Sequence, residues 1–411
     1  MSSDRIGLNR RMSPRPCGLH LWMATIASAS CLSGLTGLRN GWPGWNGPEA
    51  AALRSRLAVH DDAAVATAIG RVSARAFQEF LAGIVAYRAH PYRRSMPEPP
   101  PVARYGTVRL LEYSKPGRSG RGAGPPLLLI PSLVNRGYVL DLMPDVSLAR
   151  FLAAAGAPVY LLEWNTPDSE ESGFDLDRLI RERLMPALAD VAARAGPPAL
   201  VGYCMGGLLA LVAAQQKMAE VAGLAVLATP WDFHAERPAQ ARALAELTGA
   251  WLPTLNALGQ FPVDALQALF AANDPMVAFR KFRAFARMAP DSDAARRFVA
   301  LEDWLNDGIP LPLPIARETL QSWYGDNLTA SGRWTVGVTT VRPEEIGLPA
   351  LAIIPDRDRI VPQESAMALA RLLPEAEIRI ARAGHIGMMA GRRAERETWR
   401  PLLAWQQSLA R

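Results

Sequence analysis

The residues with the clearest chemical potential stand at positions 202–207, which read GYCMGG. An apolar run at residues 199–203 leads into this motif, and an apolar stretch with helical spacing, residues 206–218, follows it. A nucleophile on a tight turn between a strand and a helix forms a nucleophile elbow, here with cysteine in place of the commoner serine. The helix N-terminus would favour the thiolate of Cys204, and the N–H of Met205 would face the oxyanion formed during attack. We therefore predict that Cys204 is a nucleophile and not a buried structural cysteine.

A thiol nucleophile needs a base, and the base needs a group that orients it. In a protein with a nucleophile elbow, the acid and then the histidine follow the nucleophile along the chain. His385 stands in the sequence AGHIG after the last predicted strand, in a chain with five histidines. Asp356 and Asp358 both follow the strand before it, and we favour Asp358 because it lies deeper in the turn. Asp232, which follows an earlier strand, is the alternative acid.

A second donor to the oxyanion should come from the loop after the strand predicted at residues 127–131. We place it at the main-chain N–H of Val134. Asn135 and Arg136 come next, at the carboxyl end of a strand, where ligands gather in open α/β sheets. We predict a substrate-binding role for Asn135, with simple capping of the loop as the alternative.

The elements that must position these residues alternate between short apolar strands and helical segments. Strands are predicted at residues 107–113, 127–131, 158–162, 199–203, 224–228, 351–355 and 377–381. Helices are predicted at residues 49–90, 141–155, 179–195 and 206–218. This alternation indicates a mostly parallel, doubly wound α/β sheet.

Four parts of the chain follow from this pattern. We predict an N-terminal helical extension with a proline-rich linker (1–105), a first part of the α/β core (106–231), a largely helical cap insertion (232–346) and a second part of the core (347–411). The sequence PEPPP at residues 97–101 is a stiff linker. Residues 19–38 are mildly apolar and carry no acidic side chain, so they predict a surface or lipid-contacting helix, with a signal peptide as the alternative.

Composition restricts the classes of function. The chain has 411 residues and a net charge of +6, but its arginines are scattered and form no basic stripe, so we expect no nucleic-acid partner. Three cysteines do not make a disulfide framework and favour a reducing compartment. The histidines have no metal-ligand spacing, so no bound metal is expected.

Eight segments together resemble the polyhydroxyalkanoate synthases, a family of α/β-hydrolase-fold acyltransferases with a cysteine nucleophile. The matching segments are residues 131–142, 163–167, 202–207, 229–233, 304–307, 327–328, 358–362 and 384–386. Their order supports Asp358 over Asp356 as the acid. Arg359 departs from the family, which usually has histidine there, and so do residues 386–391 and the N-terminal 105 residues.

The resemblance implies a function. A synthase of this family polymerises (R)-3-hydroxyacyl-CoA into polyester through an acyl-cysteine and releases CoA. It implies Cys204 as the acylated residue, His385 as the base and Asp358 as its partner. It also implies an acyl-CoA substrate with no further cofactor, a homodimer, and a cytoplasmic location at the surface of polymer granules.

Two other functions remain open on the sequence. If water replaces the hydroxyl acceptor, the protein is a hydrolase of thioesters or polyester. If Cys204 on the elbow has no catalytic activity, the protein instead binds granules or a membrane through its N-terminal apolar run. The intact elbow motif argues against this inactive protein.

Overall fold

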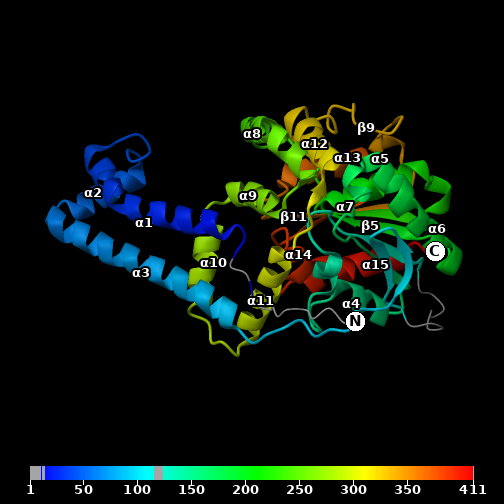
Figure 1. The fold of residues 1–411 in the computed structure, drawn as a ribbon, viewed down its shortest axis with the longest axis horizontal. Helices are drawn as coiled ribbons and strands as arrows, with labels where there is room; N and C mark the ends of the chain where they lie inside the picture. The colour runs from blue at the N-terminus through cyan, green and yellow to red at the C-terminus, as the bar shows by residue number, and fades with distance from the viewer. Residues whose placement is uncertain (1–10, 12–13, 115–123, 411) are drawn as a thin grey trace. The chain divides into compact units, whose positions relative to one another are not determined.

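The computed structural model describes residues 11, 14–114 and 124–410, and these residues form two compact units (Figure 1). The larger unit takes in the described residues of Arg94–Leu269 and Asp307–Arg411. The smaller unit takes in those of Met1–Arg93 and Phe270–Asn306. Each unit has its own apolar core.

An eight-stranded sheet in the order β1-β2-β4-β3-β5-β6-β11-β12 forms the centre of the larger unit. Its strands, in this order, are β1 Pro101–Tyr105, β2 Val108–Glu112, β4 Val159–Glu163, β3 Leu127–Ile130, β5 Ala199–Tyr203, β6 Gly223–Leu227, β11 Ala350–Pro355 and β12 Ala376–Ala381. The β1–β2 and β2–β4 pairs are antiparallel, and every other neighbouring pair is parallel. Strands β3, β4, β5, β6 and β11 are buried along their whole length, as expected for a sheet covered on both faces. The predicted fold class, a mostly parallel doubly wound α/β sheet, is confirmed.

The edge of the sheet begins earlier than predicted. Pro101, the last residue of the predicted linker, is the first residue of β1, which pairs with β2. Proline is tolerated at the first position of an edge strand because no neighbour there needs its missing N–H group. The predicted boundary at residue 105 therefore lies after a strand of the core.

The functional loops share one edge of the sheet because of strand register. β3 pairs with β5 in parallel, and Ile130 lies opposite Gly202. The two strands therefore end side by side, so the loop that contains Val134 and the turn that contains Cys204 leave the same edge of the sheet.

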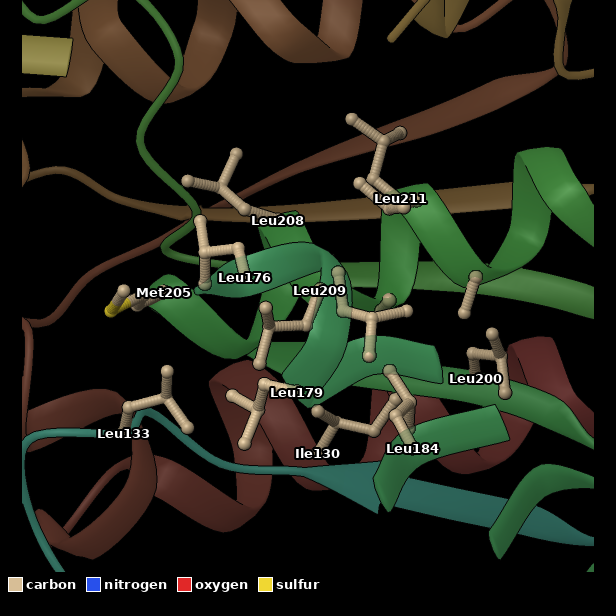
Figure 2. Packing of buried hydrophobic residues seen from close by; sticks show 14 of the residues in the cluster. Ile130, Leu133, Leu176, Leu179, Leu184, Leu200, Met205, Leu208, Leu209 and Leu211 are labelled. Carbon is tan, nitrogen blue, oxygen red and sulfur yellow. The ribbon is translucent and has the colours of Figure 1, made fainter. Parts of the chain in front are cut away.

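Helices of the larger unit follow the strands and cover the sheet. They are η1 Gly137–Asp141, α4 Leu148–Ala154, η2 Glu171–Gly173, α5 Leu176–Leu179, η3 Ile180–Leu184, α6 Met185–Ala195, α7 Met205–Gln216, η4 Met218–Glu220, α13 Gln363–Leu372, α14 Gly387–Ala390, η7 Glu395–Trp399 and α15 Arg400–Ser408. The helix predicted from residue 141 begins instead at Leu148, where Ser147 caps it. Figure 2 shows α7 side chains, among them Leu208 and Leu211, in the same apolar cluster as Leu200 of β5.

The insertion between β6 and β11 is mainly helical, as its composition predicts. Its elements are α8 Pro238–Leu258, β7 Gln260–Phe261, α9 Val263–Asn273, α10 Val277–Phe285, α11 Asp293–Asn306, β8 Leu311–Pro312, α12 Leu313–Arg317, η5 Glu318–Gly325, β9 Thr335–Val336, β10 Thr339–Thr340 and η6 Pro343–Glu345. The four short strands form two antiparallel pairs, β7–β8 and β9–β10, which the sequence did not predict.

The smaller unit joins α1 Cys17–Asn40, α2 Pro48–Leu57 and α3 Asp62–Ala89 to helices α10 and α11. Asp61 caps α3 by accepting a hydrogen bond from the N–H of Ala64, as the acidic start of that helix predicts. This division corrects the predicted cap, because α10 and α11 lie within residues 232–346 but belong to the N-terminal unit. The cause is aromatic packing: Phe282 of α10 meets the rings of Phe80 and Tyr87 of α3 edge to face.

Candidate active site

Cys204 lies at a strained turn between β5 and α7. Its φ is 55° and its ψ is −126°, a backbone conformation that residues other than glycine rarely adopt. Two backbone hydrogen bonds maintain this strained conformation. The N–H of Cys204 donates to the carbonyl of Leu227 (2.9 Å), and the carbonyl of Cys204 accepts from the N–H of Gly207 (2.9 Å). The thiol is free and only partly buried. This is the geometry of a nucleophile elbow.

Close backbone packing explains the glycines around the cysteine. A Cβ atom on Gly206 would collide with the carbonyl oxygen of Ile130 at the end of β3. A Cβ atom on Gly207 would collide with the side chain of Thr229 beyond β6. Glycine at both positions therefore lets the start of α7 lie against the ends of β3 and β6, the strands on either side of β5.

His385 and Asp358 form a buried hydrogen-bonded pair. Nδ1 of His385 lies 2.6 Å from Oδ2 of Asp358, and the two side chains are 8% and 0% exposed. The other oxygen of Asp358 accepts the N–H groups of Ile360 (2.8 Å) and Val361 (2.9 Å). The loop between β11 and α13 therefore fixes the carboxylate, and the carboxylate fixes the imidazole.

The electrostatics of His385 link it to the cysteine. Burial lowers the pKa of His385, but the charges of Cys204 and Asp358, with hydrogen bonds to both side chains, raise it to about 10. These charge effects place the imidazole close to the thiol. Because Nδ1 is bound to Asp358, Nε2 is the atom left to face Cys204. An imidazole in this position can take the thiol proton and keep it.

The two other candidate acids have different surroundings. Asp356 pairs with Arg357, and its side chain is 35% exposed. Asp232 accepts from the side-chain amide of Asn327 (2.8 Å) and from the N–H of His234 (2.9 Å), so it organises a turn after β6. Of the three aspartates, Asp358 is the one that the structure places against His385.

The predicted oxyanion donors come from the two loops that the register of β3 and β5 brings together. Met205 is the first residue of α7, so its N–H has no acceptor within the helix. The carbonyl of Val134 accepts from Ile309 (3.1 Å), and within the described part of the chain its N–H has no hydrogen-bond acceptor. Asn135 is buried and forms a β-bridge with Gly308. These contacts hold the loop after β3 against residues 308–309, in the middle of the insertion.

Two tyrosines near the site were not predicted. Tyr203 donates to the carbonyl oxygen of His385 (3.1 Å), and the two rings lie 5.2 Å apart. Tyr203 stands within the elbow motif, so its position in the sequence could have identified it as a residue of the site. Burial and the charge of Cys204 raise the pKa of Tyr324 to about 12, which places this phenol near Cys204. Tyr324 lies in the insertion, and nothing in the sequence marks it.

No metal ligands are assigned: among residues 11, 14–114 and 124–410, no three histidine, cysteine or acidic side chains converge in an arrangement that could hold an ion.

Comparison with known proteins finds similarity to α/β-hydrolase-fold proteins. A family model described as the alpha/beta hydrolase fold matches residues 192–391. The chain is 27% identical over 310 residues to a "Poly(3-hydroxyalkanoate) polymerase subunit PhaC" of Haloferax mediterranei, covering 74% of this chain and 62% of that protein. The protein of the same name from Allochromatium vinosum is 26% identical, with 72% of this chain and 84% of that protein covered.

The chain also matches a Haloarcula marismortui protein of this name at 26% identity and covers 60% of its length, so it spans about three fifths of either haloarchaeal relative. Among solved structures, a monoacylglycerol lipase of Paleococcus ferrophilus matches with a TM-score of 0.49 and 18% identity, covering 74% of this chain and 99% of that one.

Proposed function

From a chain that has the α/β-hydrolase fold and is related to the poly(3-hydroxyalkanoate) polymerases, we propose an acyltransferase that polymerises (R)-3-hydroxyacyl-CoA into polyester through an acyl-cysteine. The observation that carries the proposal is the arrangement of Cys204 on the elbow beside the bonded pair of His385 and Asp358. The names of the relatives supply the substrate class. The site supplies a nucleophile, a base and a group that orients the base.

The first half of the proposed cycle loads the enzyme. His385 takes the proton of Cys204, and the thiolate attacks the carbonyl carbon of the acyl-CoA thioester. The N–H groups of Met205 and Val134 would stabilise the negative oxygen of the tetrahedral intermediate. The bond to the CoA sulfur then breaks, and CoA leaves with the proton from His385. One thioester replaces another, so this step changes the free energy little.

The second half transfers the acyl group to a hydroxyl. The 3-hydroxyl of a second hydroxyacyl unit attacks the acyl-cysteine carbonyl while His385 accepts its proton. The carbon–sulfur bond breaks, an ester bond forms, and the proton returns to Cys204. Repetition of the two halves lengthens a polyester chain. Every step uses acyl-CoA as substrate, and none calls for a metal or an organic cofactor.

The nature of the acceptor separates this proposal from hydrolysis. If water attacks the acyl-cysteine in place of the 3-hydroxyl, the same residues make a hydrolase of thioesters or polyester. As partners we propose the hydroxyacyl-CoA, the growing polyester and a second copy of the chain, with the enzyme in the cytoplasm at the surface of its polymer. These proposals rest on the family resemblance.

The test measures CoA release and polymer together. The purified full chain is incubated with 3-hydroxybutyryl-CoA or with a medium-chain homologue. Free CoA is measured by chromatography, because Cys31 is exposed and Cys204 partly so, and both would react with a thiol reagent. Products are sized, and Cys204→Ala is assayed beside Cys31→Ala, a matched change at a cysteine outside the site.

CoA release with high-mass polyester, lost in Cys204→Ala and kept in Cys31→Ala, is the expected result. Release of CoA with only free hydroxy acid would assign the protein to the hydrolases. No release with either substrate, while Cys204 still reacts with a thiol probe, would show that the acyl donor differs from the one proposed.

A further inference from the structure

Helix α1 of the smaller unit is unusually apolar for a helix on a surface. It has 24 residues and is the one helix in the described part of the chain that is long and apolar enough to cross a membrane. Only 17% of its most apolar window is buried. Between Arg15 and Arg39 the sequence has no lysine, arginine, aspartate or glutamate. The helix therefore exposes apolar surface that the unit itself leaves uncovered.

The exposed apolar side chains of α1 follow one face of the helix. Trp22, Ile26 and Leu32 are 62%, 45% and 48% exposed, and Ala29 between them is exposed as well. The steps of three and four residues between these positions place them on one side of a helix. Single apolar residues are common on protein surfaces, but a continuous apolar stripe marks a site of contact.

Three exposed hydroxyl groups of α1 are already hydrogen-bonded to backbone carbonyls of the same helix. Thr25 donates to the carbonyl of Leu21 (2.8 Å), Ser30 to that of Ile26 (2.7 Å), and Ser33 to that of Ser30 (2.8 Å). Serine and threonine that bond back to their own helix present little polarity to their surroundings. The exposed face is therefore compatible with a medium that offers no hydrogen bonds.

The opposite face of α1 is held by α3, which runs beside it (Figure 1). Ala24 is buried in the cluster that contains Phe80 of α3. The hydroxyl of Ser73 on α3 donates to the carbonyl of Ser28 (2.9 Å). Because one face is fixed to protein, α1 suits a position in the plane of an interface better than one across it.

Exposed tryptophans lie at both ends of α1, and the segment α1–α3 is basic. Trp22 lies near the start of α1, and Trp42 and Trp45, 52% and 41% exposed, follow its end. Tryptophan favours the boundary between hydrocarbon and water. Residues 14–89, which hold α1–α3, carry seven arginines and four acidic side chains, a net charge of +3, although Arg39 is paired with Asp62. This excess of positive charge is complementary to anionic headgroups, which attract basic segments to a membrane surface.

A groove of about 960 Å³ on the α3 side of α1, away from Trp22, Ile26 and Leu32, offers further space for hydrocarbon chains. Its lining includes Leu35 and Leu38 of α1, Leu53 and Leu57 of α2, and Ile69 of α3. A volume of this size accommodates a ligand such as a lipid acyl chain.

We propose that helices α1–α3 bind the surface of an anionic phospholipid membrane, with Trp22, Ile26 and Leu32 among the acyl chains. A polyester surface would also be apolar, but it is neutral and offers no charge to the arginines. The assignment goes beyond the proposed acyl transfer, because it concerns a different unit of the chain and a different ligand.

The experiment is flotation of the full chain with vesicles of phosphatidylcholine, alone or mixed with phosphatidylglycerol. The test variant is Ile26→Lys with Leu32→Lys. The matched control is Val338→Lys with Leu372→Lys, two exposed apolar residues of the larger unit. We expect tighter binding to the anionic vesicles, a loss of about tenfold or more in partition for the test variant, and no change for the control. Melting curves of both variants verify the fold.

A second measurement does not depend on these variants. A fluorophore on a cysteine introduced by Ala29→Cys on the exposed face, with Cys17, Cys31 and Cys204 replaced by serine, should be quenched by lipids that carry a spin label in the acyl chain. Three results would overturn the proposal: no flotation with anionic vesicles, equal flotation of test variant and wild type, or no quenching of the fluorophore at position 29. Binding to polyester particles without binding to vesicles would overturn it too. Because partition is measured without turnover, failure here leaves the proposed acyl transfer untouched.

Discussion

Asp358 accepts a hydrogen bond of 2.6 Å from Nδ1 of His385. The second oxygen of the carboxylate is occupied by two backbone N–H groups of its own loop, so the side chain has one orientation. That orientation selects the tautomer of the imidazole and turns Nε2 toward Cys204. In the proposed mechanism the pair orients the base, and this role can be tested by removing the charge of the acid.

Asp358→Asn should lower kcat for CoA release by about 10³-fold. The amide keeps the shape of the side chain but removes the negative charge that stabilises the imidazolium. Its NH₂ group can also donate to Nδ1 of His385, which favours the tautomer with the proton on Nε2, so that Nε2 can no longer accept the thiol proton. The measurement is kcat with a saturating acyl-CoA, together with a melting curve that reports the fold.

Asp356→Asn is the matched control for this substitution. Asp356 lies two residues away in the same loop and pairs with the exposed Arg357, so we expect kcat within about twofold of the wild type. Equal losses in the two variants would show that the geometry of the pair does not determine activity.

The stability of the protein should depend on pH through His385. Burial opposes protonation, but Cys204 and Asp358 raise the pKa of His385 to about 10, above the value of about 6.5 in an unfolded chain. A group with a raised folded-state pKa adds stability that is complete below about pH 6.5 and is lost as the pH rises through about 10. The Tm of the wild type should therefore fall between pH 7 and pH 10 more steeply than that of His385→Gln.

Cys204→Ala refines this measurement. It removes one of the two charges that raise the pKa of His385, so the fall in Tm should begin at a lower pH. Parallel curves for all three proteins would mean that His385 does not titrate in this range.

The parts of the site that depend on local order could be predicted from the sequence. A strand, a turn with glycines and a helix identify the elbow at Cys204, and chain order then leads to the loops that contain the acid and the histidine. Asp356 and Asp358 stand in one turn, so sequence alone separates them weakly. The bonds from Ile360 and Val361 are what orient Asp358, and they depend on the shape of that turn.

Packing between distant segments could not be predicted. α10 joins the N-terminal unit because Phe282 meets Phe80 and Tyr87, which stand about 200 residues earlier in the chain. Tyr324 approaches the nucleophile only once the insertion has folded. Strand β1 was missed because its proline is characteristic of linkers unless it stands at the start of an edge strand.

Gly207→Ala should destabilise the protein by about 2 kcal/mol or more, because its Cβ would overlap the buried side chain of Thr229. The matched control is Gly249→Ala within α8, where a Cβ meets no atom within 4 Å. Alanine favours a helix, so this control should gain about 0.5–1 kcal/mol. The free energy of unfolding from denaturant titration tests both. A loss of stability in the control equal to that in Gly207→Ala would mean that close packing at the elbow is not the cause.

Tyr324→Phe should slow acylation of Cys204 by about tenfold with little change in Tm. Burial and the charge of Cys204 raise the pKa of the phenol to about 12, so the hydroxyl keeps its proton even at alkaline pH and is available as a hydrogen-bond donor near Cys204. A donor that stabilises developing charge in a site with little water contributes about this much to a rate. The first turnover, followed in a rapid-mixing burst, measures the step directly.

Tyr160→Phe is the control, because the pKa of Tyr160 is also raised to about 12, but its hydroxyl bonds to Glu112 and has no contact with the nucleophile. The control should acylate at the wild-type rate, and an equal slowing in both variants would assign the effect to general loss of a buried hydroxyl.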